Sequence, residues 1–207
     1  RRTVPEIGAT VLTLSNGVEV WLKPTDFKND QVMFSAYAPG GYSLAPEQSY
    51  KSANLATAMV GVGGMGGLNP VDLSKMLSGK IAQAQPQISD YQQGISGTST
   101  PKDLETALQL NYLAQTAPNM TPDVLELLKR RLEPSLQNRD QNPRAVFGEK
   151  VEQVNTSNHY SAQPFTMADL PKLDLAAMRS FYNARFGNAD EEVGEVGAFT
   201  EAEITPL

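Results

Sequence analysis

Residues 10–25, TVLTLSNGVEVWLKPT, decide the fold class because they predict a β-hairpin. The dipeptide Asn16-Gly17 strongly favours a turn, and Val18, Val20 and Leu22 alternate on the strand that follows it. A second alternating stretch, DQVMFSAYAPGG at 30–41, predicts another strand that ends at its proline and glycines. The chain therefore opens with consecutive strands.

Helices and one more pair of strands follow. Apolar residues at helical spacing predict a helix over 48–62, ended by glycines, and a shorter one over 69–80. Two strands are expected between 81 and 100, with Pro86 placing the first at a sheet edge or breaking it. Further helices are predicted to begin near Thr100, Thr121, Pro143 and Thr166, before a short final strand at 192–200. Clustered strands followed by paired helices indicate an α+β fold rather than an alternating parallel sheet.

The composition suits one globular domain without a nucleic-acid-binding surface. The chain has 207 residues, 40% of them hydrophobic, which is enough apolar material for a core. Its formal net charge is −6, and its basic run, KRR at 129–131, is flanked by Glu126 and Glu133. Such a run is typical of a solvated helix face, so we expect no nucleic-acid partner.

Cysteine and long apolar segments are both missing from the sequence. Without cysteine there can be no disulfide, thiolate zinc ligand or cysteine nucleophile, and the cytoplasm and the periplasm are equally compatible. No run reaches the roughly 18 apolar residues of a membrane-spanning helix, and no signal peptide is visible. The abrupt start and the end at EITPL, inside a predicted helix, suggest a fragment of a longer chain.

No stretch assembles a familiar catalytic site. His159 is the only histidine, and because a metal site needs several donors, we expect this residue to form hydrogen bonds or to pack. The segment GVGGMGGLNP at 61–70 lacks the lysine of a phosphate-binding loop, which favours glycines serving as a flexible loop or as close-packing spacers. The carboxylates of Asp190, Glu191 and Glu192 lie in a polar run and are expected to be solvated.

One helical stretch, KSANLATAMVGVGG at 51–64, carries no group suited to catalysis. Lys51 is its only charged residue. Asn54, Thr57 and Ala58 occupy positions at which one turn of a helix could present metal ligands. Either this is an ordinary core helix of an unrelated α+β protein, or it is a catalytic helix that has lost its ligands.

Three segments resemble the domains of pitrilysin/insulinase metallopeptidases, the inverted zincins. Residues 14–46, beginning LSNGVEV, are similar to the family's opening L-x-N-G-[LV]-x-V, which leads to a helix with the motif H-x-x-E-H. Residues 170–189 and 196–204 are similar to the family's later helix and to the strand after it. The resemblance implies a mostly antiparallel sheet packed on helices, truncated at the C-terminus, in one domain of a multi-domain bacterial member.

The same resemblance implies that the metal motif is degenerate here. The first histidine falls on Asn54, the glutamate general base on Thr57 and the second histidine on Ala58. Asparagine, threonine and alanine cannot hold zinc and activate water as the family's motif does. The resemblance therefore implies no catalytic and no metal-binding residue in this segment.

The family's third metal ligand would come from the neighbourhood of RRLEPSLQ at 130–137. Glu133 lies there, but the best match places Pro134 or Ser135 at the ligand position. One carboxylate would hold zinc poorly in any case. The resemblance thus implies no cofactor in this segment and zinc in the catalytic domain of the parent chain.

Residues 1–207 are thus expected to form a single non-catalytic domain of a zinc metalloprotease, which encloses the substrate chamber and supports peptide binding at a sheet edge. Its partners would be other domains of the same chain or a homologous subunit, in the periplasm or cell envelope. The alternative is a non-enzymatic scaffold subunit that acts by protein–protein association. Packing roles are expected for Leu55, Met59, Leu108 and Leu113 in the core and for Trp21 on the first hairpin.

The final strand fits the family poorly. Where the family has an apolar strand, this chain has DEEVGEVGAF at 190–199. Because a buried, unpaired carboxylate is costly, we expect either an edge strand or a strand confined to 196–199.

Overall fold

The hairpin predicted at residues 10–25 is present. The computed structural model describes residues 1–187 and 192–206. Strands β2 (Ala9–Thr13) and β3 (Glu19–Pro24) pair antiparallel with Leu12 opposite Val20. Gly17 in the turn has a φ of 94°, a conformation that glycine adopts without steric cost. The predicted hairpin is therefore confirmed, and the amide of Leu14 bonds to the carbonyl of Val18 across the turn.

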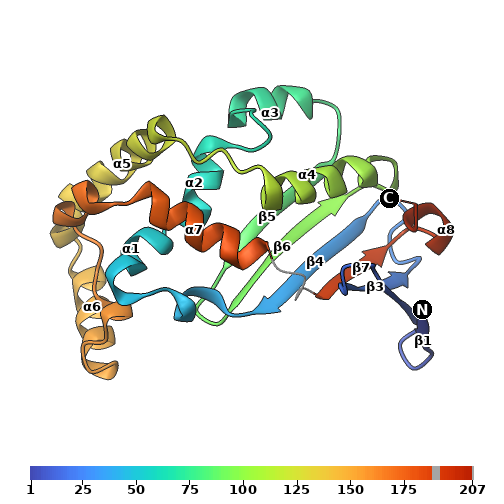
Figure 1. Ribbon diagram of the computed structural model, residues 1–207, viewed down its shortest axis with the longest axis horizontal. Coiled ribbons are helices and arrows are strands. Elements are labelled where there is room, and N and C mark those ends of the chain that lie inside the picture. Colours follow the sequence, from blue (N-terminus) through green and yellow to red (C-terminus); the bar gives the residue numbers. More distant parts are fainter. Residues whose placement is uncertain (188–191, 207) are drawn as a thin grey trace.

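The described residues form one seven-stranded sheet with helices packed against it (Figure 1). Its strand order is β1-β2-β3-β7-β4-β6-β5, and the β3–β7 pair is parallel while the other neighbours are antiparallel. This architecture confirms the predicted α+β class with a mostly antiparallel sheet. The remaining strands are β1 (Arg2–Val4), β4 (Val32–Pro39), β5 (Ala82–Ile88), β6 (Gln92–Ser99) and β7 (Glu192–Gly197).

Most helices begin close to the residues predicted from the sequence. The helix predicted near Thr166 is an exception: Met167–Lys172, which contain Pro171, form a 3₁₀ helix, and the α-helix begins only at Leu175. Asn69, Thr100 and Thr121 each accept a hydrogen bond from a main-chain amide of the turn that follows, which satisfies donors left free at a helix start. The helices are α1 (Tyr50–Ala53), α2 (Ala56–Gly63), α3 (Pro70–Met76), α4 (Leu104–Thr116), α5 (Pro122–Gln137), α6 (Pro143–Asn155), α7 (Leu175–Phe186) and α8 (Glu201–Ile204). Among the described residues, none of these helices has the length and apolar character needed to cross a membrane.

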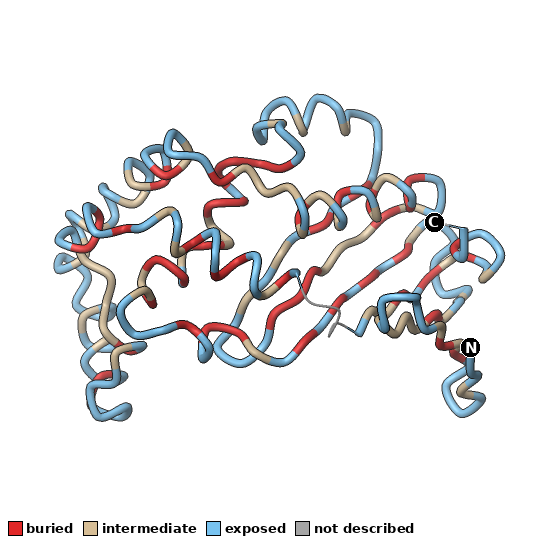
Figure 2. The backbone as a smooth tube through the Cα atoms, viewed as in Figure 1, coloured by how far each residue is buried: buried red, intermediate tan, exposed pale blue. Residues whose placement is uncertain are grey.

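The core lies between the helices and one face of the sheet. Along β4 buried residues alternate with exposed ones, so one face of the strand is covered and the other is open (Figure 2). Met59 is fully buried. The three leucines that were also predicted to lie in the core, Leu55, Leu108 and Leu113, are only half-buried at the margin of the core. Trp21 is half-buried on the hairpin beneath the guanidinium of Arg2, 4.8 Å from its ring.

The position of β7 contradicts both expectations for the final strand. This strand covers Glu192–Gly197 and lies inside the sheet, parallel to β3 and antiparallel to β4. Both predictions assumed that a strand with acidic residues avoids the interior; instead Glu195 is buried beside Leu22 and Phe34. Glu192 is exposed as expected, and Asp190 and Glu191 lie outside the described residues. The edge position predicted for the strand with Pro86 is confirmed in β5.

Candidate functional site

The helix predicted over 48–62 is broken in two. Helix α1 ends at Ala53 and α2 begins at Ala56, because the amide of Leu55 bonds to the carbonyl of Ser52, 3.1 Å away, in a tighter turn. Asn54 therefore lies outside the helix that carries Thr57. The one-turn spacing that metal ligands require is interrupted between these two positions.

The structure places the three motif positions in different surroundings. Asn54 is exposed, and Ala58 is half-buried against the core. The Thr57 hydroxyl lies 3.3 Å from the hydroxyl of Tyr42. Burial, partly offset by this hydrogen bond, raises the pKa of Tyr42.

The other candidate donors lie elsewhere. Glu133 is exposed on α5, where its carboxylate accepts a hydrogen bond from Gln137 at 3.2 Å. His159 is exposed in a short 3₁₀ turn; its Nδ1 lies 2.9 Å from the Ser161 hydroxyl, and its ring packs 4.2 Å from that of Tyr160. Hydrogen bonding and packing are the roles that the sequence predicted for this histidine.

These residues do not fit a zinc ion. Zinc sites in proteins use three or four nitrogen, sulfur or carboxylate donors around one point. Across residues 1–187 and 192–206, no three His, Asp or Glu side chains gather closely enough to hold a metal. Ala58 offers no donor, and Thr57 binds another hydroxyl instead. We therefore derive no chemical step through a metal at this position.

Thr57 instead lines a groove of about 700 Å³ between α2, α3 and the outer side of β5. Leu73 and Leu77 provide an apolar wall, and Gly61 leaves open space on α2 because nothing lies within 4 Å of where its Cβ would be. The groove brings together residues from three separate elements. In the sequence, only the glycine-rich segment and Pro86, which predicted an edge strand, gave any sign of it.

The glycines at 61–67 act in part as close-packing spacers. A Cβ on Gly63 would approach the carbonyl oxygen of Asn119 to 2.1 Å. The Asn119 side chain fastens this loop, donating to the carbonyls of Gly63 and Leu68 and accepting from the amide of Gly67. The side chain of Asn119, from the connection between α4 and α5, thus holds this loop in place. The loop borders the groove, and it does not form the N-terminal turn of a helix that could bind a phosphate.

The edge of β5 that faces the groove has free main-chain groups. No described strand pairs with β5 on this side. The amide of Ser89, just beyond β5, donates to Gln92 of β6, which fixes the alternation of hydrogen bonds along the pair. The main-chain groups of Ala82, Ala84 and Pro86 consequently point away from β6. Pro86, which lacks an N–H, occupies an outward position where no partner loses a bond.

Comparison with known proteins decides the family. No family model matches the chain. The chain is 34% identical to the "Zinc protease PQQL-like" of Arabidopsis thaliana over 184 residues, which cover 88% of this chain. The chain belongs to the pitrilysin-type (M16) peptidase family. This M16 chain spans 17% of the Arabidopsis relative's length, so it corresponds to a small part of that protein.

Solved structures show the same fold. The periplasmic protease PqqL from Escherichia coli superposes with a TM-score of 0.81 and 20% identity over 96% of this M16 chain and 22% of its own. A peptidase M16 inactive domain from Pseudomonas fluorescens superposes with a TM-score of 0.74 and 16% identity over 95% of this chain and 48% of its own. At these identities the likeness establishes the fold of the M16 chain.

Proposed function

We propose that residues 1–207 form one non-catalytic M16 domain that encloses a substrate chamber and holds extended peptide without cleaving it. The observation that carries this proposal is a groove with a free strand edge on one side and, on the other, a helix whose motif positions lack the histidines and glutamate that hold zinc. Asn54, Thr57 and Ala58 are then the degenerate remains of H-x-x-E-H. Zinc and cleavage belong to a catalytic domain elsewhere in the parent protein.

The peptide adds to β5 as an extra strand. Its amides and carbonyls pair with the outward groups of Ala82 and Ala84, and Pro86 ends the pairing because it offers no donor. Alternate side chains of the bound strand point toward Leu73 and Leu77 on the groove wall. In recognition of this kind main-chain hydrogen bonds give the affinity, and the alternate side chains that face the groove wall set the register of the bound strand.

The uncovered sheet face supports the enclosing role. Met33, Tyr37 and Val196 are 56, 42 and 42% exposed, and Met33 and Val196 are paired neighbours on this face. Exposed apolar side chains gathered on one face are typical of an interaction surface. We propose that another domain of the same chain, or a homologous subunit, faces this surface. Periplasmic location is proposed from the Escherichia coli protease with the same fold.

The binding mode is tested with backbone-methylated peptides. Two fluorescent ten-residue peptides of one sequence carry N-methyl groups on alternate residues, offset by one position. Because a strand directs successive amides to opposite sides, one methylated peptide should bind at least about tenfold more weakly than the other by anisotropy. Gly61→Phe should fill the groove and weaken the binding of the unmethylated peptide, whereas Gly61→Ala should leave that binding unchanged. Equal binding of both methylated peptides would contradict strand addition.

The absence of cleavage is tested separately. The 207-residue chain, incubated with zinc and an unstructured peptide, is expected to give no products by mass spectrometry. Cleavage that a chelator stops, and that Glu133→Gln abolishes, would overturn the non-catalytic assignment.

A further inference from the structure

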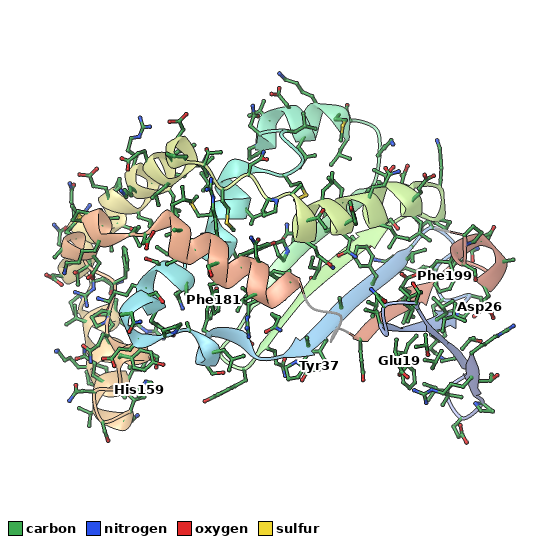
Figure 3. The ribbon with its side chains drawn as sticks, viewed as in Figure 1. Glu19, Asp26, Tyr37, His159, Phe181 and Phe199 are labelled. Atoms are coloured by element: carbon green, nitrogen blue, oxygen red, sulfur yellow. The ribbon has the colours of Figure 1, made fainter. Side chains whose placement is uncertain are left out.

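A second hollow, of about 560 Å³, lies at the turn end of the β5–β6 hairpin. Its walls come from four segments distant in sequence: the 3₁₀ turn after β4, helix α1, the hairpin turn, and the end of α6 with the turn after it. Figure 3 marks this region at His159, at the opposite end of the molecule from Asp26. Its aromatic and titratable lining residues are Tyr42, Tyr50, Tyr91, Tyr160, Asp90, Glu152 and His159.

The tyrosine rings are held in fixed positions. Tyr42 stacks on Phe181 with ring centroids 5.9 Å apart, and Tyr50 meets Tyr160 edge-on at 5.2 Å. Tyr42 and Tyr50 are buried, whereas Tyr91 on the hairpin turn is 74% exposed. Rigid aromatic walls with one exposed ring at the rim can contact a ligand over several faces at little entropic cost.

The hollow is acidic as well as aromatic, and no Lys or Arg is among the residues that line it. Asp90 and Glu152 are exposed, and neither carboxylate forms an ion pair with any described residue. Burial and the negative charge of Asp90 both raise the pKa of Tyr50. Lys51 on α1 is engaged elsewhere, by Asp169 and the carbonyl of Pro164.

We propose that this hollow binds the cationic side chain, arginine or lysine, of a peptide held at β5. Aromatic faces attract cations, and the two carboxylates supply the complementary charge. The inference rests on the proposed function, because β5 runs from the groove to the hairpin turn. A peptide that pairs with Ala84 and continues unpaired beyond Pro86 would reach the hollow after about six further residues, or about 20 Å. The hydrogen bond between Tyr42 and Thr57 joins the walls of the two hollows.

The test uses peptides that differ only in charge. Two twelve-residue peptides carry a single arginine at one end or the other, and each is matched by a citrulline analogue, which has nearly the same shape without the charge. One arginine peptide should bind the 207-residue chain about tenfold more tightly than its citrulline match. Asp90→Asn/Glu152→Gln should abolish this difference. Asp26→Asn/Asp30→Asn, which removes the same charge at two exposed positions that do not line the hollow, should preserve it.

Two results separate the two proposals. If the peptides bind but arginine and citrulline are equal at both ends, the hollow has no cation preference and this inference is overturned while the proposed function stands. If no peptide binds, the proposed function fails, and Nα-acetylarginine amide is compared with Nα-acetylcitrulline amide by NMR. Tyrosine ring shifts caused only by the arginine compound, and lost in Asp90→Asn/Glu152→Gln, support the hollow; equal effects overturn it.

Discussion

Glu195 occupies a costly position for a carboxylate. It is 4% exposed in the interior strand β7, between Leu22 of β3 and Phe34 of β4, and its Oε2 has no hydrogen-bond partner among the described residues. Burial raises its pKa from 4.5 to about 7 because the charged form loses its hydration. The neutral acid is therefore the form that suits the fold.

This shift predicts a loss of stability as the pH rises. The folded pKa lies above the unfolded one, so the ionisation of Glu195 costs nothing below about pH 4.5, where the carboxyl is neutral in both states, and progressively destabilises the fold between there and pH 7. A shift of this size corresponds to about 3 kcal/mol at higher pH. Glu195→Gln should therefore match the wild type at pH 4.5 but be more stable by about 2–3 kcal/mol at pH 8.5, as measured by urea unfolding.

Glu192→Gln is the control for this measurement, because Glu192 is exposed in the same strand. Its unfolding midpoints should follow the wild type at every pH. A Glu195→Gln profile parallel to that of the wild type would show that Glu195 ionises in the folded protein without penalty.

At the scale of elements, helix α2 carries two glycines with opposite surroundings. Gly63 packs against the loop at Asn119 and against Val124 of α5, whose side chain would lie 2.9 Å from an added Cβ. Gly61 is exposed and nothing lies within 4 Å of its Cβ position. Gly63 allows α2 and α5 to approach each other, and Gly61 leaves the groove open.

Alanine substitutions at these glycines should change stability in opposite directions. Gly61→Ala should raise the free energy of unfolding by about 0.5–1 kcal/mol, because alanine favours the helix. Gly63→Ala should lower it by about 2 kcal/mol or more, because the backbone of the neighbouring loop must move. Chemical denaturation of both variants checks the pair, and a stabilising Gly63→Ala would refute the close packing.

At the scale of the whole molecule, a partly buried ion pair connects segments distant in sequence. Lys51 of α1 donates to Asp169 at 2.7 Å, and the same carboxylate accepts from the amide and hydroxyl of Thr166. Burial opposes ionisation of Asp169, but these hydrogen bonds outweigh it and lower its pKa. Nearby, the Asp174 amide donates to the buried Ser52 hydroxyl. These contacts hold α1, which lines the hollow, against the C-terminal part of the chain.

Removing this carboxylate should loosen that attachment. Asp169→Asn is expected to lower the free energy of unfolding by about 1–3 kcal/mol at pH 7. Because the folded pKa is the lower one, the contribution is present above the ordinary carboxyl pKa and disappears as the pH falls through the lowered value. Asp72→Asn, which breaks the exposed pair with Lys75, should cost about 0.5 kcal/mol or less. Both variants are measured by thermal and urea unfolding. Equal losses of stability in Asp169→Asn and Asp72→Asn would show that burial does not strengthen the Lys51–Asp169 ion pair.

The sequence by itself determined the local elements and the family resemblance. Asn16-Gly17 fixes a hairpin and the alternation in β4 fixes a buried face, because turn geometry and side-chain direction depend on neighbouring residues. The absence of histidine and glutamate at Asn54, Thr57 and Ala58 is also readable directly, since the identity of a side chain does not depend on the fold.

Only the tertiary structure decided where β7 lies, that α1 and α2 are separate, and which residues line the groove and the hollow. The acidic composition of β7 favoured an edge, but pairing on both sides placed it inside, and Glu195 bears the cost. The hollow combines residues from Tyr42 to Ser161, and the groove combines residues from Thr57 to Pro86. Local sequence patterns carry no information about such meetings, because they depend on how whole elements pack.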